Sequence, residues 1–163
     1  MHMENVMTAW AVGLHDRLTE AAGELGLGVR DIAALTLVAS HPDVPVDWLR
    51  ARIGLSQPGT VRLVDRLSAA GLIERAGREG RSVHLAVTPA GRELLDRWTG
   101  RRDQAVRGLT TGLAPAQQAQ LTELLTVALS TPDRPRAEAD QACRACDWPA
   151  CGADCPVSRS VRS

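Results

Sequence analysis

Four cysteine thiols near the C-terminus are the residues of this chain whose type and spacing most clearly predict chemistry. Cys143, Cys146, Cys151 and Cys155 form the pattern Cys-x2-Cys-x4-Cys-x3-Cys-Pro. Deprotonated thiols are strong ligands for zinc and for iron–sulfur clusters, and four of them in one short segment can all reach a single small centre. The spacing therefore predicts a shared metal site at these four residues.

Two metal centres are compatible with this spacing. A zinc ion held by all four thiolates would fold a tail that has few apolar residues, because metal-binding free energy becomes folding free energy. The compact run that ends in Cys-x3-Cys-Pro is nearer to iron–sulfur spacing, although its Cys-x4-Cys step departs from the Cys-x2-Cys of bacterial ferredoxins. Reversible disulfides, or a tail without function, are the remaining alternatives. The predicted cofactor is zinc or an iron–sulfur cluster, and no organic cofactor is evident.

The sequence contains none of the common catalytic motifs. It has no glycine-rich phosphate loop, no His-Glu-x-x-His motif and no set of Ser, His and Asp that spacing could connect. We therefore expect no catalytic residues and no enzyme activity. A small redox or metal-binding protein that uses the cysteine cluster is one alternative function for the chain.

The overall charge excludes a uniformly basic, nucleic-acid-binding surface. The 163 residues include 19 basic and 19 acidic side chains, and 44% of the residues are apolar, which is an ordinary globular composition. No apolar run approaches the roughly 18 residues of a membrane span, and the N-terminus lacks the basic start and apolar stretch of a signal peptide. We expect a cytoplasmic protein with no membrane partner.

The charge is distributed unevenly along the chain, and every basic residue is Arg. Residues 1–49 carry two Arg and seven acidic side chains, whereas residues 50–107 carry twelve Arg and six acidic side chains. The positive charge is therefore concentrated in the middle segment, where the phosphates of a nucleic acid would need to be neutralised.

Apolar periodicity divides the chain into helices around one β-hairpin. Steps of three and four between apolar residues predict helices, and strict alternation predicts strands. The predicted helices are 7–25, 30–40, 45–53, 57–70, 89–111 and 115–130, and the predicted strands 72–75 and 82–87 flank a tip at 76–81. This order is typical of a winged helix-turn-helix, a mainly α fold with a small β-hairpin.

We expect one folded domain, a linker and a tail. Residues 1–130 hold the winged helix-turn-helix and its flanking helices, 131–141 with their prolines form the linker, and 142–163 form the cysteine-rich tail. The amphipathic helices at the two ends of the first domain have no partner lobe within the chain. We therefore expect them to join two copies about a two-fold axis, with packing on their own core as the alternative.

The predicted helix 57–70 has a polar face suited to the major groove of DNA. Arg reads guanine and Gln reads adenine through paired hydrogen bonds, so both are useful on such a face. A solvated amphipathic face is the plainer alternative. The candidate DNA-binding residues of this helix and its cap are Ser56, Gln57, Gly59, Thr60, Arg62 and Arg66.

The predicted hairpin tip favours the DNA-binding interpretation. Arg78 and Arg81 place two like charges on a glycine-flanked turn, which is more positive charge than stability alone would select. Arg entering a narrow minor groove is a known mode of shape readout. Arg78 and Arg81 therefore join the candidate DNA-binding set.

Two segments resemble the winged helix-turn-helix of MarR-type transcriptional regulators. They are LSQPGTVRLVDRLSAAGLIER at 55–75 and REGRSVHLAVTPAGRELL at 78–95, and the resemblance extends over about residues 7–129. It implies a homodimer in which the first and last helices interlock and each recognition helix and wing reads half of a pseudo-palindromic operator. A wing acid and an Arg two residues apart recur in such proteins. Here they fall on Glu79 and Arg81, although the usual acid is Asp.

The resemblance also implies a regulatory role. The expected function is sequence-specific binding of double-stranded DNA by a repressor that a small-molecule or redox signal releases. Small aromatic effectors often bind such proteins in a cleft between the dimer region and the DNA-binding lobe. MarR-type domains do not in general carry a four-cysteine tail, so the resemblance leaves the cysteine segment unassigned.

Overall fold

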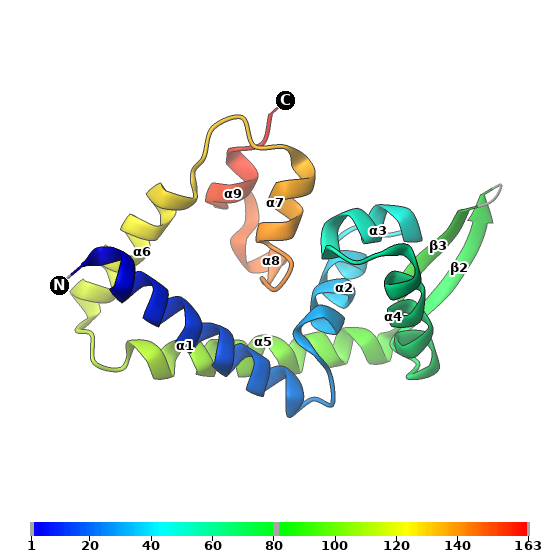
Figure 1. The fold of residues 1–163 in the computed structure, drawn as a ribbon, viewed down its shortest axis with the longest axis horizontal. Helices are drawn as coiled ribbons and strands as arrows, with labels where there is room; N and C mark the ends of the chain where they lie inside the picture. The colour runs from blue at the N-terminus through cyan, green and yellow to red at the C-terminus, as the bar shows by residue number, and fades with distance from the viewer. Residues whose placement is uncertain (1, 80–81, 163) are drawn as a thin grey trace.

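The structure, a computed structural model, describes residues 2–79 and 82–162 and has a lobe at one end of two long helices. The long helices, α1 (Met3–Gly23) and α5 (Pro89–Thr110), pack against each other (Figure 1). The lobe contains α2 (Val29–Ser40), α3 (Val46–Ile53), α4 (Gln57–Ala69) and a small sheet. Helix α6 (Pro115–Leu129) follows α5 at the opposite end. None of the helices in the described residues is long and apolar enough to cross a membrane.

Three antiparallel strands in the order β1-β3-β2 form the sheet. Strand β3 (Ser82–Val87) pairs on one side with β2 (Ile73–Glu79) and on the other with the short β1 (Val44–Pro45). The predicted mainly α winged helix-turn-helix fold is therefore confirmed. Strand β1 was not predicted, because two residues are too few to show an alternating pattern.

Two predicted boundaries in this lobe are wrong. Strand β2 continues to Glu79 instead of ending at residue 75, with a register shift between Arg75 and Gly77 that interrupts the alternation of side chains. Pro45 belongs to β1 and caps α3, whereas the sequence predicted it as the first residue of that helix. The extended backbone of Pro45, with φ −71° and ψ 152°, suits both a strand and the cap that precedes a helix.

One apolar core joins the lobe to the long helices. Its fully buried side chains come from α2, α3, α4, β3 and α5, and they include Ile32, Leu35, Leu49, Leu67, Leu85 and Trp98. Trp98 lies in the middle of α5, which connects the core of the lobe to the rest of the molecule. The placement of α4 and the wing therefore depends on how α5 packs.

The start of α5 is fixed tightly against the strands. The Thr88 hydroxyl accepts a hydrogen bond from the Gly91 N–H at 3.1 Å and donates one to the Gly71 carbonyl at 2.6 Å. Gly91 is buried, and a Cβ atom at its position would lie only 2.2 Å from the Leu72 carbonyl oxygen. The helix can approach the backbone of Leu72, the residue before β2, this closely only because residue 91 has no side chain.

The predicted linker and tail form a folded segment. Residues 136–141 of the predicted linker and the first residue of the predicted tail form α7 (Arg136–Ala142). It is followed by α8 (Trp148–Cys151), the 3-10 helix η1 (Gly152–Asp154) and α9 (Pro156–Arg159). Helix α7 contacts α3, and α9 contacts α6 (Figure 1). The tail, defined as residues 136–162, thus connects the lobe to α6. The linker prediction failed because α7 is held by tertiary contacts that composition does not show.

Candidate nucleic-acid interface

An open groove runs between α4 and the base of the wing. Its volume is about 890 Å³, and residues from β1, α3, α4, β2 and β3 line it. Its polar lining includes Arg50, Gln57 and Arg75. The groove therefore presents side chains that can bind phosphates or base edges.

Local capping determines which face of α4 lines the groove. The Ser56 hydroxyl accepts a hydrogen bond from the Gly59 N–H at 3.3 Å, and Pro58 lies in the first turn, where a missing N–H costs nothing. Leu63, Val64 and Leu67 turn the opposite face into the core. The exposed positions of the predicted set are Ser56, Gln57, Arg62 and Arg66, and Gly59 is half-buried.

The structure corrects the prediction for Thr60. Its side chain is 0% exposed, and its hydroxyl donates a hydrogen bond to the Ser56 carbonyl at 3.1 Å. Thr60 is among the residues that line the groove, but its side chain presents no exposed surface there. Its residue type and its place in the helix did not indicate this burial.

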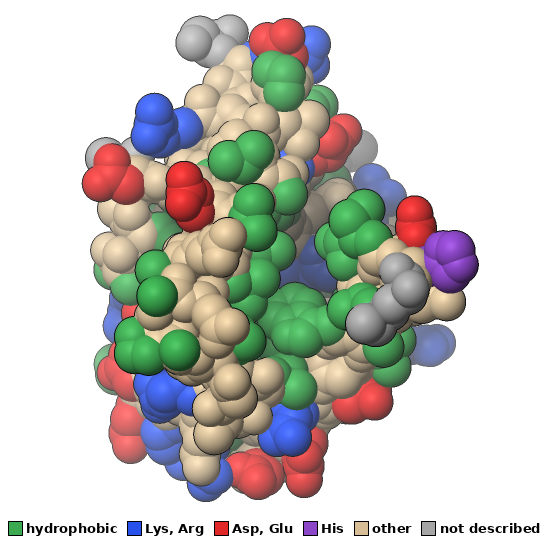
Figure 2. Space-filling view, turned by 90° about the vertical axis from the view of Figure 1, so that its left-hand side faces the viewer, with side chains coloured by type: hydrophobic (Ala, Val, Ile, Leu, Met, Phe, Trp, Pro, Cys, Tyr) green, Lys and Arg blue, Asp and Glu red, His purple; other side chains and the backbone are tan. Residues whose placement is uncertain are grey.

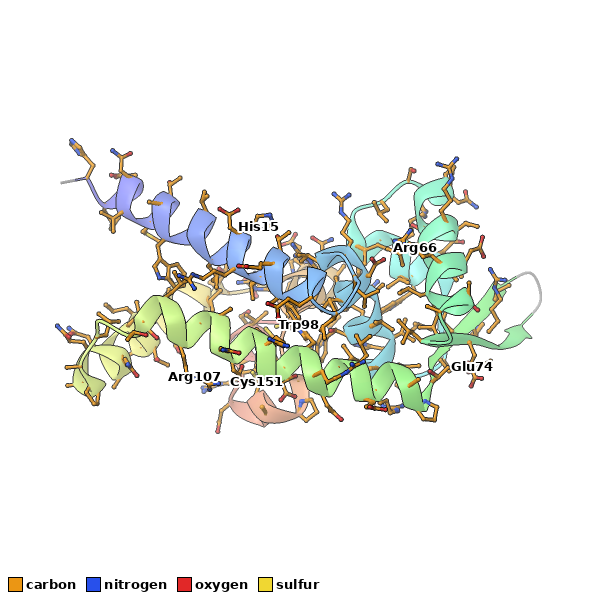
Figure 3. The ribbon with its side chains drawn as sticks, turned by 90° about the horizontal axis from the view of Figure 1, so that it is seen from below. His15, Arg66, Glu74, Trp98, Arg107 and Cys151 are labelled. Carbon is orange, nitrogen blue, oxygen red and sulfur yellow. The ribbon has the colours of Figure 1, made fainter. Side chains whose placement is uncertain are left out.

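Arg66 links α4 to α2 and also remains half-exposed. Its Nη2 lies 2.5 Å from the Asp31 carboxylate, whose other oxygen accepts a hydrogen bond from the Gly28 N–H at 2.9 Å. Asp31 thus caps the start of α2 while it binds Arg66. Figure 3 shows Arg66 at the lobe end of the molecule, where α4 lies. Arg62 is exposed, and it makes no hydrogen bond or ion pair with the part of the chain that the structure describes.

Sequence reasoning missed two arginines of the groove. Arg50 comes from α3, where it lies 3.4 Å from Asp47, and Arg75 comes from β2, where it lies 2.6 Å from Asp65 of α4. Both partners are exposed carboxylates, so these ion pairs contribute little and can exchange for phosphate contacts. The one signal in the sequence was the concentration of Arg between residues 50 and 107.

The predicted wing-tip residues lie at the edge of what the structure describes. Arg78 and Glu79 are part of the β2 backbone and pair with Val83 and Ser82, but their side chains are not described. Arg81 lies outside the described residues. Their predicted contact with DNA stays a prediction.

A buried carboxylate joins the tail to the lobe. Asp140 of α7 is 0% exposed, and its two oxygens accept hydrogen bonds from Arg52 Nε of α3 at 2.6 Å and from Arg136 Nε at 2.9 Å. His41 Nε2 lies 3.8 Å from one of these oxygens. Two cations thus compensate a carboxylate that could not remain buried alone.

Aromatic rings enclose this ion cluster. The Arg52 guanidinium lies 3.8 Å from the centre of the Trp48 ring, and the His41 ring lies 4.7 Å from Trp48 and 4.8 Å from Trp148 of the tail. Burial lowers the pKa of His41, and the nearby Asp140 carboxylate opposes this shift. We call Asp140, Arg52, Arg136, His41, Trp48 and Trp148 the docking cluster.

The four predicted cysteines come together in the structure. Cys143, Cys146, Cys151 and Cys155 are free thiols that line one pocket of about 60 Å³. Within residues 2–79 and 82–162, no group of three or more His, Cys, Asp and Glu side chains stands arranged to hold a metal ion. The fold therefore gathers the thiols without forming a finished coordination shell.

The thiols influence one another's protonation. The Cys146 sulfur has its pKa lowered to about 7, first by a hydrogen bond with Cys143 and also by the positive charge of Arg102. The same hydrogen bond raises the pKa of Cys143, and burial raises the pKa of Cys151. At neutral pH Cys146 is therefore the most nucleophilic of these three thiols.

Comparison with known proteins relates the lobe to one family. Residues 25–82 match the model of the MarR family, and this segment includes α4 and most of the wing but excludes the cysteine tail. No curated protein matches the chain.

Solved structures share the fold over most of the chain. A MarR family protein of Mycobacterium tuberculosis in complex with DNA has a TM-score of 0.67 at 18% identity, covering 77% of this chain and 95% of that one. Apo MarR from E. coli has a TM-score of 0.68 at 18% identity, covering 79% and 98%. A MarR family regulator from Rhodococcus sp. RHA1 has a TM-score of 0.61 at 26% identity, covering 76% and 90%. Residues 25–82 therefore match the MarR family, and the chain outside the tail has the winged helix-turn-helix fold of these solved MarR family structures.

Proposed function

We propose that the chain is a homodimeric repressor that binds a pseudo-palindromic operator in double-stranded DNA. The observation that carries this proposal is the groove between α4 and the wing, which presents Gln57, Arg50 and Arg75 beside the exposed Arg62. An exposed helix flanked by arginines is suited to enter the major groove. The DNA complex of the Mycobacterium tuberculosis relative, which has the same fold, supports this proposal.

The proposed division of labour follows from side-chain chemistry. Gln57 and Arg62 at the exposed face of α4 read base edges, while Arg50 and Arg75 contact phosphates. Arg78 and Arg81 of the wing enter the neighbouring minor groove. Arg66 positions α4 through its ion pair with Asp31 and contributes its exposed half to the phosphate contacts.

Removing the Arg62 guanidinium tests the role of α4. We expect Arg62→Ala to weaken binding to the DNA upstream of the protein's own gene by about 1 to 3 kcal/mol and to relax base preference at one position. Arg81→Ala should weaken shape-dependent affinity with little change in base preference. Fluorescence anisotropy measures the DNA affinity of both variants. The salt concentration is kept fixed because affinity for DNA falls steeply as salt rises.

The control for this experiment is an arginine outside the groove. Arg97 is an exposed residue of α5, so Arg97→Ala removes the same charge without touching α4. Equal affinity of wild type, Arg62→Ala and Arg97→Ala would rule out the proposed reading face. A loss for Arg62→Ala alone, at an unchanged melting temperature, would support it.

Exposed apolar side chains support the homodimer. Helix α6 buries no residue in the single chain, and Leu124 and Val127 are 60% and 71% exposed. Met3, Met7 and Val12 of α1 are also more than half exposed. Figure 2 views the molecule from the end that holds α6 and the N-terminus, and apolar side chains are spread over this face. A second copy packed here would remove them from water.

Light scattering tests the homodimer. We expect a dimer at micromolar concentration, and we expect Val127→Glu to shift the protein toward monomer because a buried, unpaired charge is costly. Glu123→Gln on the same helix is the matched control and should remain dimeric. A wild-type monomer, with and without DNA, would contradict the proposed assembly.

A cleft beside α5 supports control by a small molecule. It has a volume of about 650 Å³, and Thr36, Arg92, Trp98 and Trp148 are among its lining residues. This combination of apolar walls and a few polar groups suits a small aromatic effector. The Mycobacterium tuberculosis relative has also been solved with p-aminosalicylic acid, at 19% identity and a TM-score of 0.62. We propose that an aromatic acid in this cleft, or a redox change at the cysteines, releases the repressor from DNA.

A further inference from the structure

The tail has too small an apolar core to fold on its own contacts. Among its described residues, the buried apolar cluster consists of Ala139, Cys155 and Val157, with Cys143 and Val161 packed partly against it. Segments shorter than about 40 residues usually need a disulfide, a metal ion or a partner to hold a fold. The four thiols are the groups of the tail that can supply such a cross-link.

Backbone turns bring the thiols to one point. Cys143 ends α7, Cys151 ends α8, and Cys155 immediately precedes α9. The Cys146 N–H donates to the Cys143 carbonyl at 3.0 Å, and the Trp148 indole N–H donates to the same carbonyl at 2.9 Å. These hydrogen bonds hold the backbone from which the Cys143 and Cys146 side chains project.

A guanidinium group lies beside the thiol pocket, because Arg136 of α7 is among its lining residues. Four thiolates around one divalent cation leave a net charge of −2, which this guanidinium group would partly offset. Arg136 also binds Asp140, so the pocket adjoins the docking cluster.

We propose that Cys143, Cys146, Cys151 and Cys155 bind one zinc ion as four thiolates. Binding forms four Zn–S bonds of about 2.3 Å and releases up to four protons, with no change of oxidation state. The thiols already line one pocket. A tetrahedral arrangement of the four sulfur atoms then requires rotation of the cysteine side chains.

The size of the pocket favours zinc over an iron–sulfur cluster. The pocket between the thiols is small, with a volume of about 60 Å³. A single ion fits this space. A cubane core with its four irons and four sulfides would need more space between the four cysteines.

Zinc at this position holds the tail in the form that contacts α3, α5 and α6. Gln141 of α7 donates to the Ala51 carbonyl of α3 at 3.1 Å, and the Trp98 indole of α5 donates to the Ala145 carbonyl of the tail at 3.3 Å. Helix α9 contacts α6 at the other side. Metal occupancy is thereby coupled to the contacts that hold the tail on the lobe and on α5.

Metal analysis of the full chain purified without oxygen tests the proposal. We expect one zinc ion per chain, no absorbance near roughly 400 nm, and no reaction of the cysteines with an alkylating reagent until a chelator is added. Iron and sulfide with visible absorbance would overturn zinc in favour of a cluster. Four reactive thiols without metal, or a mass that shows two disulfides, would overturn the metal site.

Single substitutions test whether each thiol is a ligand. Cys146 and Cys151 are exposed, so Cys146→Ser and Cys151→Ser leave the buried Cys155 in place. We expect each substitution to lower zinc affinity by at least about tenfold. Removal of a residue that only hydrogen-bonds to a metal ligand can already cause a loss of this size. Ser158→Ala, which alters the pocket without removing sulfur, should keep full zinc content. Unchanged affinity in both cysteine variants would overturn four-thiolate binding.

The zinc measurement is independent of DNA. Zinc content and thiol reactivity are measured on the protein alone, so failure of the operator experiment leaves this result intact. Trypsin cleavage after Arg144 reports the state of the tail, because Arg144 lies between Cys143 and Cys146. We expect chelation to accelerate this cleavage by at least tenfold, and an unchanged cleavage rate after zinc removal would contradict the role of the ion in holding the tail.

Discussion

Asp140→Ala is expected to undock the tail and to lower the free energy of unfolding by about 3 to 5 kcal/mol, the usual cost of removing one partner from a buried ion pair. The variant leaves Arg52, whose side chain is only 13% exposed, without its carboxylate. It also frees Arg136 and removes the negative charge beside His41. The tail then loses the main polar contact between α7 and α3.

Thermal unfolding and proteolysis measure this effect. A protein of this length loses about 2 to 4 °C of melting temperature per kcal/mol, so the shift should be large. Glu138→Ala on the same helix is the matched control, since Glu138 is exposed and its loss should cost no more than about 0.5 kcal/mol. If Asp140→Ala and Glu138→Ala melt together and resist trypsin equally, the docking cluster does not hold the tail.

Gly91→Ala is expected to destabilise the lobe by about 3 kcal/mol, near the upper end of the usual cost of overpacking. The new Cβ atom would lie 2.2 Å from the Leu72 carbonyl oxygen and 2.7 Å from Val87 Cγ2. The first of these neighbours is backbone, so relief requires the start of α5 to move away from the strands. Such a movement would also shift the wing relative to α4 and weaken DNA binding.

Gly100 provides the control for this experiment. It lies in the middle of α5, and a Cβ atom at its position would meet nothing within 4 Å. Gly100→Ala should therefore stabilise the helix by roughly 0.5 to 1 kcal/mol, because Ala has the higher helix propensity. Denaturant unfolding of both variants gives the comparison. A Gly91→Ala protein as stable as wild type would show that α5 is not seated closely on the strands.

Local signals in the sequence were sufficient to predict where α4 and α5 of the molecule begin. Ser56 with Pro58 specifies the start of α4, and Thr88 with Pro89 specifies the start of α5, because capping and first-turn proline act within a few residues. The exposed face of α4 followed from helical spacing for Arg62 and Arg66, and Gln57 followed from its place at the start of the helix. The burial of Thr60 required the packed structure.

Contacts between distant residues could not be predicted in this way. Asp140 and Arg52 are separated by 88 positions, and nothing in the spacing of either residue indicates the other. The polar composition of α7 therefore suggested a linker, although one side of this helix is buried. The four cysteines were predicted to share a site because they are close in the sequence, and the structure brings them to one pocket.

The position of the tail gives the proposed zinc site its importance for regulation. The tail contacts α3 of the lobe, α5 and α6, which together hold the recognition helix and the proposed dimer surface. The cleft proposed for an effector is lined by Trp98 of α5 and Trp148 of the tail. An effector and the zinc ion would therefore act on the same contacts between tail and lobe.

Hydroxyl-radical footprinting on the DNA upstream of the protein's own gene tests the central claim most directly, because it reports where two recognition helices and two wings lie on a duplex. We predict two symmetric protected half-sites whose centres are about one helical turn, or 10 to 10.5 base pairs, apart, as expected for a two-fold dimer. Arg62→Ala should lose protection in both half-sites at the concentration that saturates the wild type. A single protected half-site, or uniform protection without sequence preference, would contradict a homodimer that reads a pseudo-palindromic operator.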